Sequence, residues 1–402
     1  MPPLRDFITG RWRAVPVLGL TQILCWGTMF YTPVLMVPLI AQARGWSIAF
    51  TMGGFSIGLL AAGITAPWVG RGIDRYGGHV VMAAGSLTGA FGFVLLVNAT
   101  HPAAYWIAWI VLGIAMGANL YDATFASLGR IFGTEARSAI TAVTLAGGFA
   151  STVGWPVTYL LLSTLGWQGT YLVYAGVLVL VAAPLHAFAL PRQRAAVVAP
   201  VAAADAPAHP AVLPPHGLTF LLVATAFAAY AFVPSGLSAH LLAIFQRGGV
   251  EAATAVTIGA LFGPAQVGAR LIEFLFARHV HPLLIARGAV SALLIGFAML
   301  EIVGVSAATA AIFMLMFGGA NGLITITRGA VPLSLFGAAG YGRVIGRLAA
   351  PFLLMQAAAP LVMAFVVERI SDPAALGLAA LFALAALGCF FAIRKPPAVT
   401  FR

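Results

Sequence analysis

The chain alternates between long apolar runs and short polar breaks. Each run is about 20 residues or longer, the length at which a helix crosses the hydrocarbon core of a bilayer. The pattern predicts twelve membrane-spanning helices with the bounds 14–40, 47–69, 80–98, 103–128, 138–164, 168–189, 217–244, 252–276, 282–304, 306–327, 345–367 and 373–393. The first run lacks a small-residue cleavage site and is longer than a signal-peptide core, so we expect it to remain as the first helix.

The composition also indicates a membrane protein. Of its 402 residues, 61% are hydrophobic and 8% are charged, whereas soluble domains carry about 25% charged residues. A soluble protein of this composition would have too few polar residues to cover its surface. A helix in lipid satisfies its own backbone hydrogen bonds. We therefore expect an all-α membrane protein.

The 21 basic residues are divided unevenly between the two sides that twelve spans define. Three lie on one side (Arg44, Arg247 and Arg369), and Arg270 lies inside the eighth run. The other seventeen share the side of both termini: Arg5, Arg11, Arg13, Arg71, Arg75, Arg130, Arg137, Arg192, Arg194, Arg278, Arg287, Arg328, Arg343, Arg347, Arg394, Lys395 and Arg402. Because basic loops face the cytoplasm, we expect an integral protein of a bacterial inner (plasma) membrane with both termini cytoplasmic.

One region interrupts the apolar rhythm near the middle of the chain. Residues 191–216 are rich in Pro and Ala and have no helical period, which is typical of an exposed linker. The linker leaves six predicted helices in residues 1–190 and six in residues 217–402. We therefore expect two six-helix bundles joined by a cytoplasmic linker, an organisation that recurs in secondary transporters.

A tight polar hairpin separates the second and third runs: Gly70-Arg-Gly-Ile-Asp74-Arg75-Tyr-Gly77. Its pattern, Gly-x-x-x-Asp-Arg-x-Gly, resembles the loop between the second and third helices of major facilitator superfamily transporters. Together with twelve helices and a central linker, the resemblance covers nearly the whole chain and implies the major facilitator fold. The chain departs from the family after Gly77, where His79 and a valine replace the expected basic pair.

The hairpin also suggests a gate. Gly70 and Gly77 permit the turn, and we expect Asp74 and Arg75 to clamp the cytoplasmic ends of the two halves while the carrier faces outward. Arg130, near the cytoplasmic end of the fourth helix, is assigned to the same gate.

Charged side chains inside a membrane are costly, so each one is a candidate functional residue. His240 is a further titratable group, and four charged residues lie inside predicted helices: Asp122, Arg270, Glu273 and Glu301. We expect Glu301, near the outer end of the ninth helix, to be interfacial.

Arg270 is the strongest candidate for substrate binding. The segment Gln266-Val-Gly-Ala-Arg270 resembles the eighth helix of the monocarboxylate carriers and of the oxalate:formate exchanger, and this resemblance implies that the arginine binds a substrate carboxylate. A guanidinium offers a rigid bidentate fork for that purpose and keeps its charge. Two other interpretations stay open: an ion pair with Glu273, one turn further on, and an arginine whose head group reaches water at the helix end.

Other helices offer uncharged groups to such a site. The exchanger has a second embedded cation in its eleventh helix, where this chain has only Gln356; a single buried cation favours a substrate with one negative charge. The first helix offers Trp26 and Tyr31, although aromatic pairs at this spacing more often serve packing. Asn321 and Gln356 are suited either to orient a ligand or to join helices.

Three residues are candidates for proton coupling. Burial raises the pKa of a carboxyl group, so Asp122 and Glu273 are suited to bind and release a proton. Histidine side chains in general titrate near neutrality, so His240 is the third candidate. The structural alternatives are a pair of Asp122 with Arg75 or Arg130, a pair of Glu273 with Arg270, and a hydrogen-bonded interface role for His240.

These observations predict a secondary active transporter that moves a small organic anion, a monocarboxylate, by alternating access with proton coupling. The alternative is an exporter of amphipathic or cationic drug-like compounds, with Asp122 as the cation site. An enzyme would need clustered catalytic or metal-ligating residues, and the sequence has none. We expect no cofactor, no metal and no nucleic-acid partner. The expected partners of this monomeric protein are a small-molecule substrate and the lipid bilayer.

Overall fold

The computed structural model describes residues 10–192, 216–238, 240–277 and 279–393, and all regular structure within these residues is helical. Most of the predicted linker, with Arg194, and Arg278 lie outside the described residues. The helices of the first half are η1 (Arg11–Arg13), α2 (Ala14–Cys25), η2 (Trp26–Phe30), α3 (Pro33–Arg44), α4 (Ile48–Tyr76), α5 (Gly78–Asn98), α6 (Pro102–Asn119), α7 (Tyr121–Phe132), η3 (Gly133–Glu135), α8 (Ala136–Gly147), α9 (Ala150–Val177), η4 (Leu178–Ala182) and η5 (Leu185–Ala189). Those of the second half are α10 (Leu218–Leu237), α11 (Leu241–Arg247), α12 (Ala252–Ala260), α13 (Phe262–Ile272), η6 (Glu273–Ala277), α14 (Pro282–Ile302), α15 (Ala307–Phe336), α16 (Tyr341–Arg369) and α17 (Asp372–Ala392).

The predicted fold class is confirmed. Ten helical runs of the described residues are long and apolar enough to cross a membrane, and each predicted span overlaps one of them. One run, Pro102–Ala189, holds three predicted spans because helical turns continue closely on both sides of Gly133 and Gly166. Both glycines have positive φ, 60° and 65°, which residues with a Cβ rarely adopt. The chain changes direction at these two points.

Polar caps at the interfaces start several helices. The Ser47 hydroxyl accepts from the Phe50 amide at 3.1 Å at the start of α4. Ser306 and Thr309 form a reciprocal capping box at the start of α15. Such caps satisfy amides that have no partner within the helix. Short polar breaks are therefore sufficient to end one span and begin the next.

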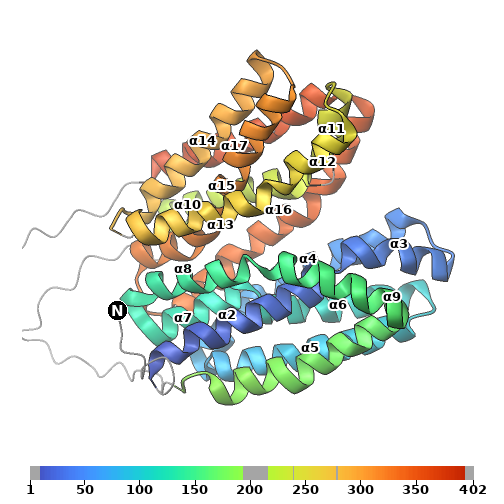
Figure 1. Ribbon diagram of the computed structural model, residues 1–402. Coiled ribbons are helices and arrows are strands. Elements are labelled where there is room, and N and C mark those ends of the chain that lie inside the picture. Colours follow the sequence, from blue (N-terminus) through green and yellow to red (C-terminus); the bar gives the residue numbers. More distant parts are fainter. Residues whose placement is uncertain (1–9, 193–215, 239, 278, 394–402) are drawn as a thin grey trace, which may run out of the picture.

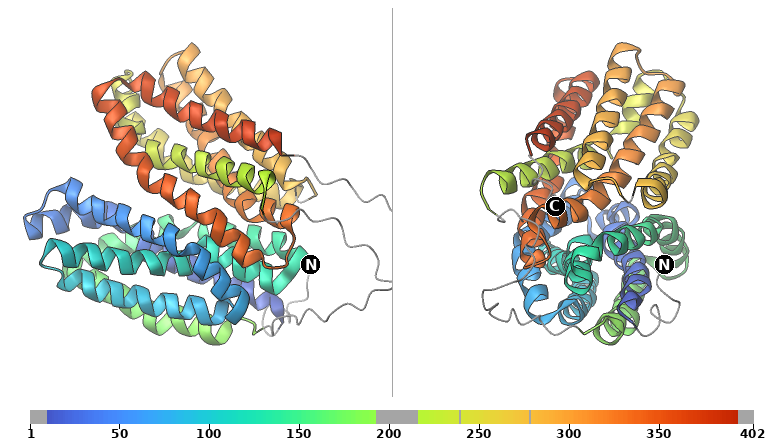
Figure 2. Two further views of the ribbon diagram at one scale, coloured as in Figure 1. Left: turned by 180° about the vertical axis from the view of Figure 1, so that it is seen from behind. Right: turned by 90° about the vertical axis from the view of Figure 1, so that its left-hand side faces the viewer.

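The two halves form two bundles that meet at one end and separate at the other (Figure 1). Figure 2 shows the same divergence from behind. We call the end with the last turn of α4 and the first turn of α16 the closed end, and the end with Arg44 and Arg247 the open end. Each half has an apolar core, and a third cluster at the closed end joins side chains of both halves, including Ile73, Phe132 and Ile345.

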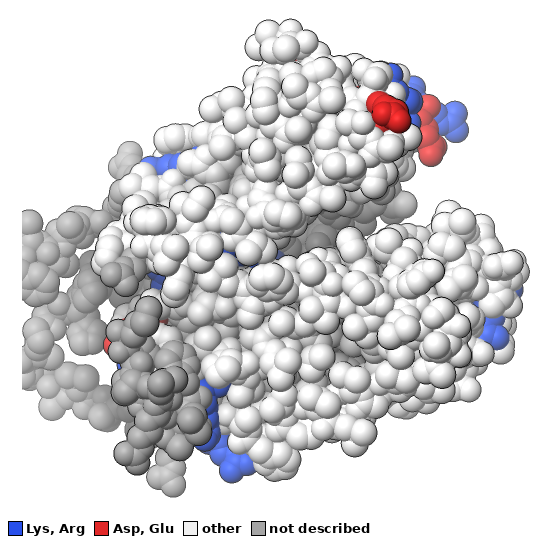
Figure 3. All heavy atoms as spheres, viewed as in Figure 1, with Lys and Arg blue, Asp and Glu red and all other residues white. Residues whose placement is uncertain are grey.

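The surface agrees with a position in lipid. Figure 3 shows Lys and Arg side chains mainly toward the two ends of the molecule, with a broad uncharged band between them. Exposed large apolar side chains lie on many spans, such as Leu180, Phe276 and Leu361. The protein is an integral membrane protein whose bundles enclose a cleft that widens toward the open end (Figure 3).

Candidate functional site

Asp74 joins the two halves at the closed end. Its carboxylate accepts hydrogen bonds from the amides of Gly342 (2.9 Å) and Arg343 (2.7 Å), the first residues of α16. A carboxylate at this position satisfies free amides and complements the positive end of the helix dipole. Arg130 donates to the carbonyl oxygens of Ile73 (3.2 Å) and Asp74, so it holds the end of α4 that presents Asp74.

Arg75 does not share this contact. Its side chain is exposed, and its guanidinium lies 5.1 Å from the ring centroid of Tyr76. The acid of the Asp-Arg pair therefore bridges the halves in this conformation, whereas the base stays at the surface.

Small residues bring α4 and α16 into backbone contact beside Asp74. A Cβ at Gly70 would overlap the carbonyl oxygen of Gly342, and one at Gly346 would overlap the carbonyl oxygen of Ala66. Ala66 and Gly70 on α4 face Gly342 and Gly346 on α16, so each helix contributes two small residues four apart. This pattern lets membrane helices approach closely.

A second contact between the halves is the ion pair of Asp122 on α7 with Arg328 on α15. The two side chains are only 14% and 13% exposed. The prediction that Asp122 pairs with Arg75 or Arg130 is wrong for this conformation. The actual partner lies 206 residues further along the chain.

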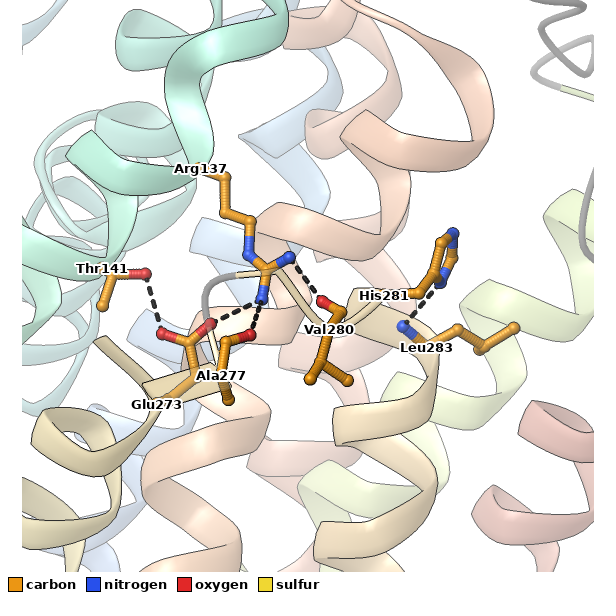
Figure 4. A network of polar contacts seen from close by, with 7 residues as sticks. All are labelled: Arg137, Thr141, Glu273, Ala277, Val280, His281 and Leu283. Carbon is orange, nitrogen blue, oxygen red and sulfur yellow. Dashed lines mark hydrogen bonds and ion pairs between the residues drawn. The ribbon is translucent and has the colours of Figure 1, made fainter. Parts of the chain in front are cut away.

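Glu273 forms a third contact, shown in Figure 4. Its side chain is 2% exposed and accepts from Arg137 at 2.7 Å and from Thr141 at 3.2 Å. Arg137 also donates to the carbonyl oxygens of Ala277 (3.1 Å) and Val280 (2.6 Å), where it compensates free carbonyls at the end of the eighth span. Glu273 is thus bound to the other half of the protein, and the expected pair with Arg270 is wrong.

Arg270 is buried between the halves, with 3% of the residue exposed. Its guanidinium donates to the carbonyl oxygen of Thr144 on α8 (2.7 Å), to that of Gly322 on α15 (3.3 Å) and to the Gln266 side-chain oxygen (3.0 Å). Among the described residues, no carboxylate lies within ion-pair distance of it. Its charge is therefore stabilised by neutral groups alone. In this conformation the head group does not reach water at the helix end, so that interpretation is excluded.

The glycine pair Gly147-Gly148 makes room for these groups. A Cβ at Gly148 would lie 2.9 Å from Arg270 Nη1, and one at Gly147 would lie 2.5 Å from the Tyr121 hydroxyl. The Tyr121 hydroxyl group and the Arg270 guanidinium thus lie beside two consecutive glycines. The ring of Trp26 lies 4.9 Å from that of Tyr121 and 6.0 Å from that of Tyr31. The structure therefore brings Trp26 and Tyr31 close to the arginine.

The remaining predicted residues have other surroundings. Asn321 precedes Gly322, the arginine's acceptor, and is partly buried on α15. Gln356 accepts through its backbone carbonyl from Ser235 at 2.6 Å, within the second half. His240 precedes α11 and its amide donates to the Leu237 carbonyl oxygen at 3.0 Å, on the side of the open end. Glu301 is exposed near the end of α14.

Sequence reasoning missed the residues that complete these contacts. Arg137 and Arg328 were counted as loop or helix-end residues, and Thr144 and Gly342 were not considered. The spacing of Gly342 and Gly346 was a usable signal, since small residues four apart mark close helix contacts. Nothing local in the sequence indicates that Thr144 offers its carbonyl to Arg270.

Two helical bundles that meet around buried charged residues and separate on one side are an arrangement typical of secondary membrane transporters. The family model described as the Major Facilitator Superfamily matches residues 18–348, and the chain belongs to this superfamily. It is therefore a transporter of that family. Residues 18–348 include the contacts of Asp74 with Gly342 and Arg343 and both members of each buried ion pair.

A curated relative and three solved structures resemble the chain. An uncharacterized 38 kDa protein in the 23S RNA operon of Thermoproteus tenax is 29% identical over 136 residues, which are 34% of this chain and 36% of that protein. The chain thus matches about a third of that relative's length. A crystal structure of the human organic anion transporter MFSD10 (TETRAN) has a TM-score of 0.71 at 17% identity, over 97% of this chain and 100% of that one.

The other two structures are sugar:proton symporters. XylE, described as a proton:xylose symporter and bound to a bromodeoxyglucose, has a TM-score of 0.73 at 11% identity, over 96% of this chain and 97% of that one. The E. coli fucose:proton symporter FucP has a TM-score of 0.71 at 11% identity, over 96% and 99%. At these identities the likeness shows the fold alone.

Proposed function

We propose that this transporter moves a small organic anion, a monocarboxylate, by proton-coupled alternating access, and that Arg270 binds the carboxylate. The observation that carries the proposal is the buried Arg270 guanidinium, whose partners among the described residues are neutral oxygens. A buried cation without a counter-ion is costly. An anionic substrate would supply the missing charge.

The charges around Arg270 support one anion of charge −1. The buried carboxylates of Asp122 and Glu273 are already paired with Arg328 and Arg137. Only Arg270 among these buried groups carries an uncompensated charge. A carboxylate is also a stronger acceptor for a guanidinium than a backbone carbonyl is. Substrate is therefore expected to replace the Thr144 or Gly322 oxygen, while Gln266 and Asn321 help to orient it.

The position of Arg270 supports a coupling of anion binding to alternating access. Arg270 belongs to the second half, and its shortest hydrogen bond goes to Thr144 in the first half. An anion that competes for this bond changes the contact between the halves. Such differential contacts are what a ligand needs in order to shift a conformational equilibrium. With the closed end on the cytoplasmic side, the structure represents the outward-facing state.

Proton coupling is proposed at Asp122 and Glu273. A proton on either carboxylate removes the charge that holds Arg328 or Arg137, and both ion pairs join the halves. Protonation therefore weakens the closed end and favours opening toward the cytoplasm. His240 lies away from these pairs and keeps only the role of a secondary candidate.

A ligand-dependent stability measurement tests the anion site. We expect lactate, acetate and benzoate as a panel to raise the melting temperature of the purified wild-type protein, because a ligand that binds the native state stabilises it. Arg270→Gln should abolish the shift. Arg287→Gln is a matched control, because Arg287 also binds carbonyl oxygens, those of Phe390 and Ile393, but within the second half.

Two outcomes would contradict the proposal. One is an equal carboxylate-dependent shift in Arg270→Gln and the wild type. The other is stabilisation by amphipathic cations and by none of the carboxylates, lost in Asp122→Asn, which would favour the cationic exporter instead.

A further inference from the structure

Aromatic rings gather beside the proposed carboxylate site. They come from the first span (Trp26, Phe30 and Tyr31), from α7 (Tyr121) and from α9 (Trp155). The Trp26 ring lies 4.6 Å from Phe30 and 4.9 Å from Tyr121, and Tyr31 lies 5.9 Å from Trp155, all measured between ring centroids. We call these five residues the aromatic cluster.

The cluster sits on an unusual piece of backbone. Trp26–Phe30 forms a π-helical turn, η2, between α2 and α3. Such turns are rare and are frequently found at functional sites. Here the wider turn presents Trp26, Phe30 and Tyr31 to one another within a single stretch of six residues. The described residues contain three further π-helical turns, η4, η5 and η6, and η2 is the turn that carries residues of the aromatic cluster.

Hydrogen bonds hold the two tryptophans by their indole edges. Trp26 Nε1 donates to Gln22 Oε1 at 3.0 Å, and Gln22 Nε2 donates in turn to the Asn119 carbonyl oxygen at 2.7 Å. Trp155 Nε1 donates to the Tyr31 carbonyl oxygen at 3.3 Å. Both polar edges are thereby satisfied, and the ring faces remain for contacts with other rings. Trp26 and Tyr31 are partly exposed, and Trp155 is 44% exposed.

Tyr121 connects the cluster to the cation. Its ring contacts Trp26, and its hydroxyl group lies beside Gly147, whose neighbour Gly148 lies beside the Arg270 guanidinium. Tyr121 follows the α6–α7 break, eleven residues before the closed-end terminus of α7 at Phe132, or about 16 Å along a helix. Tyr31 lies twenty residues after Arg11, or about 30 Å from the same end. The aromatic cluster therefore extends from Arg270 toward the open end.

We infer that the monocarboxylate taken at this site is aromatic: its carboxylate binds Arg270 and its ring stacks in the aromatic cluster. The inference rests on the proposed function. A flat ring with one carboxylate matches a surface that has one positive charge at its inner end and ring faces toward the entrance. Each favourable aromatic contact is worth about 0.5–1.5 kcal/mol beyond the burial of apolar area. A short aliphatic acid leaves these ring faces unoccupied.

The test compares acids that differ in the ring alone. Benzoate and cyclohexanecarboxylate have the same number of carbon atoms and one carboxylate, but only benzoate is flat and aromatic. Dissociation constants for both are measured with the purified full-length protein by ligand-dependent thermal shift, with benzamide as the uncharged analogue. We expect benzoate to bind about three- to tenfold more tightly than cyclohexanecarboxylate, and benzamide not to bind.

Variants assign the preference to the cluster. Trp26→Leu should remove the preference for benzoate, and Trp26→Phe, which keeps a ring, should retain most of it. Trp106→Leu is the matched control, because Trp106 is 40% exposed and stacks on Phe50 outside the cluster. The melting temperature without ligand shows whether each variant is folded.

The possible results are distinguishable. Equal affinities for benzoate and cyclohexanecarboxylate in the wild type would overturn the aromatic inference and leave the carboxylate site standing. A preference that persists in Trp26→Leu and Tyr31→Leu would overturn the assignment to the cluster. Binding of none of the carboxylates would overturn the inference together with the proposed function.

Discussion

At the scale of single residues, the charges between the two bundles follow one rule with one exception. Asp74, Asp122 and Glu273 each find their partner on the opposite half. Each contact therefore exists only while the closed end is closed. Arg270 also reaches across, but to a neutral carbonyl oxygen. Unlike Arg137 and Arg328, this buried arginine has no carboxylate partner among the described residues, and under the proposed function an external anion supplies one.

The Asp122–Arg328 pair is predicted to stabilise the closed end as a pair. Asp122→Asn or Arg328→Gln alone leaves one buried charge without its partner, so each should shift the protein toward the inward-facing state. The double variant should lie closer to the wild type, with a coupling energy of about 1–3 kcal/mol. The populations of the two states can be measured by double electron–electron resonance between spin labels at the closed end. Additive effects of the two substitutions would show that the pair does not act as a unit.

At the scale of elements, local patterns in the sequence were sufficient for most of the fold. Apolar runs mark the spans because lipid demands them. The hairpin predicted over Gly70–Gly77 is shorter than expected, because α4 continues through Gly70 and Asp74 to Tyr76 and the chain turns at Gly77. The tenth helix shows where this approach fails: the prediction stops at 327, because Arg328 was taken as a helix end, whereas α15 continues to Phe336. Within the continued helix Arg328 is paired with Asp122, and a partner so distant in sequence leaves no local signal.

The same reason limits prediction of the site. Arg270 was selected correctly as a buried arginine, because an arginine in an apolar run is conspicuous. Its environment could not be predicted, because Thr144 and Gly322 contribute backbone carbonyls that any residue type offers. The partner of Glu273 was also missed, since Arg137 looks like an ordinary loop arginine until the two halves are brought together.

The contact of α4 with α16 should be sensitive to one methyl group. Gly70→Ala places a Cβ against the Gly342 carbonyl oxygen, so the helices must separate. We expect a shift toward the inward-facing state, seen as a longer distance between spin labels at Arg71→Cys and Arg343→Cys in a background without Cys25 and Cys389. Gly53→Ala is the control on the same helix, because a Cβ there meets nothing within 4 Å. Unchanged distances in Gly70→Ala would contradict the close contact of these helices.

At the scale of the whole molecule, the contacts between the two halves follow one another from the closed end toward the open end. The Asp74 cap, the two ion pairs and the glycine contacts hold the closed end, and the aromatic cluster with Arg270 lies between this end and the open end. A proton that neutralises Asp122 or Glu273 and an anion that neutralises Arg270 would act on the same contact between halves. Under the proposed function, this arrangement couples the movement of the proton to that of the anion without a separate signalling pathway.

Counterflow into proteoliposomes tests the central claim, transport of a carboxylate bound by Arg270, most directly. Vesicles loaded with unlabelled lactate or benzoate are diluted into a trace of the same labelled acid, and protein-free vesicles measure passive diffusion. The account predicts transient accumulation of label with the wild type and with Arg287→Gln, and none above the protein-free level with folded Arg270→Gln. Accumulation by Arg270→Gln at the wild-type rate would contradict it.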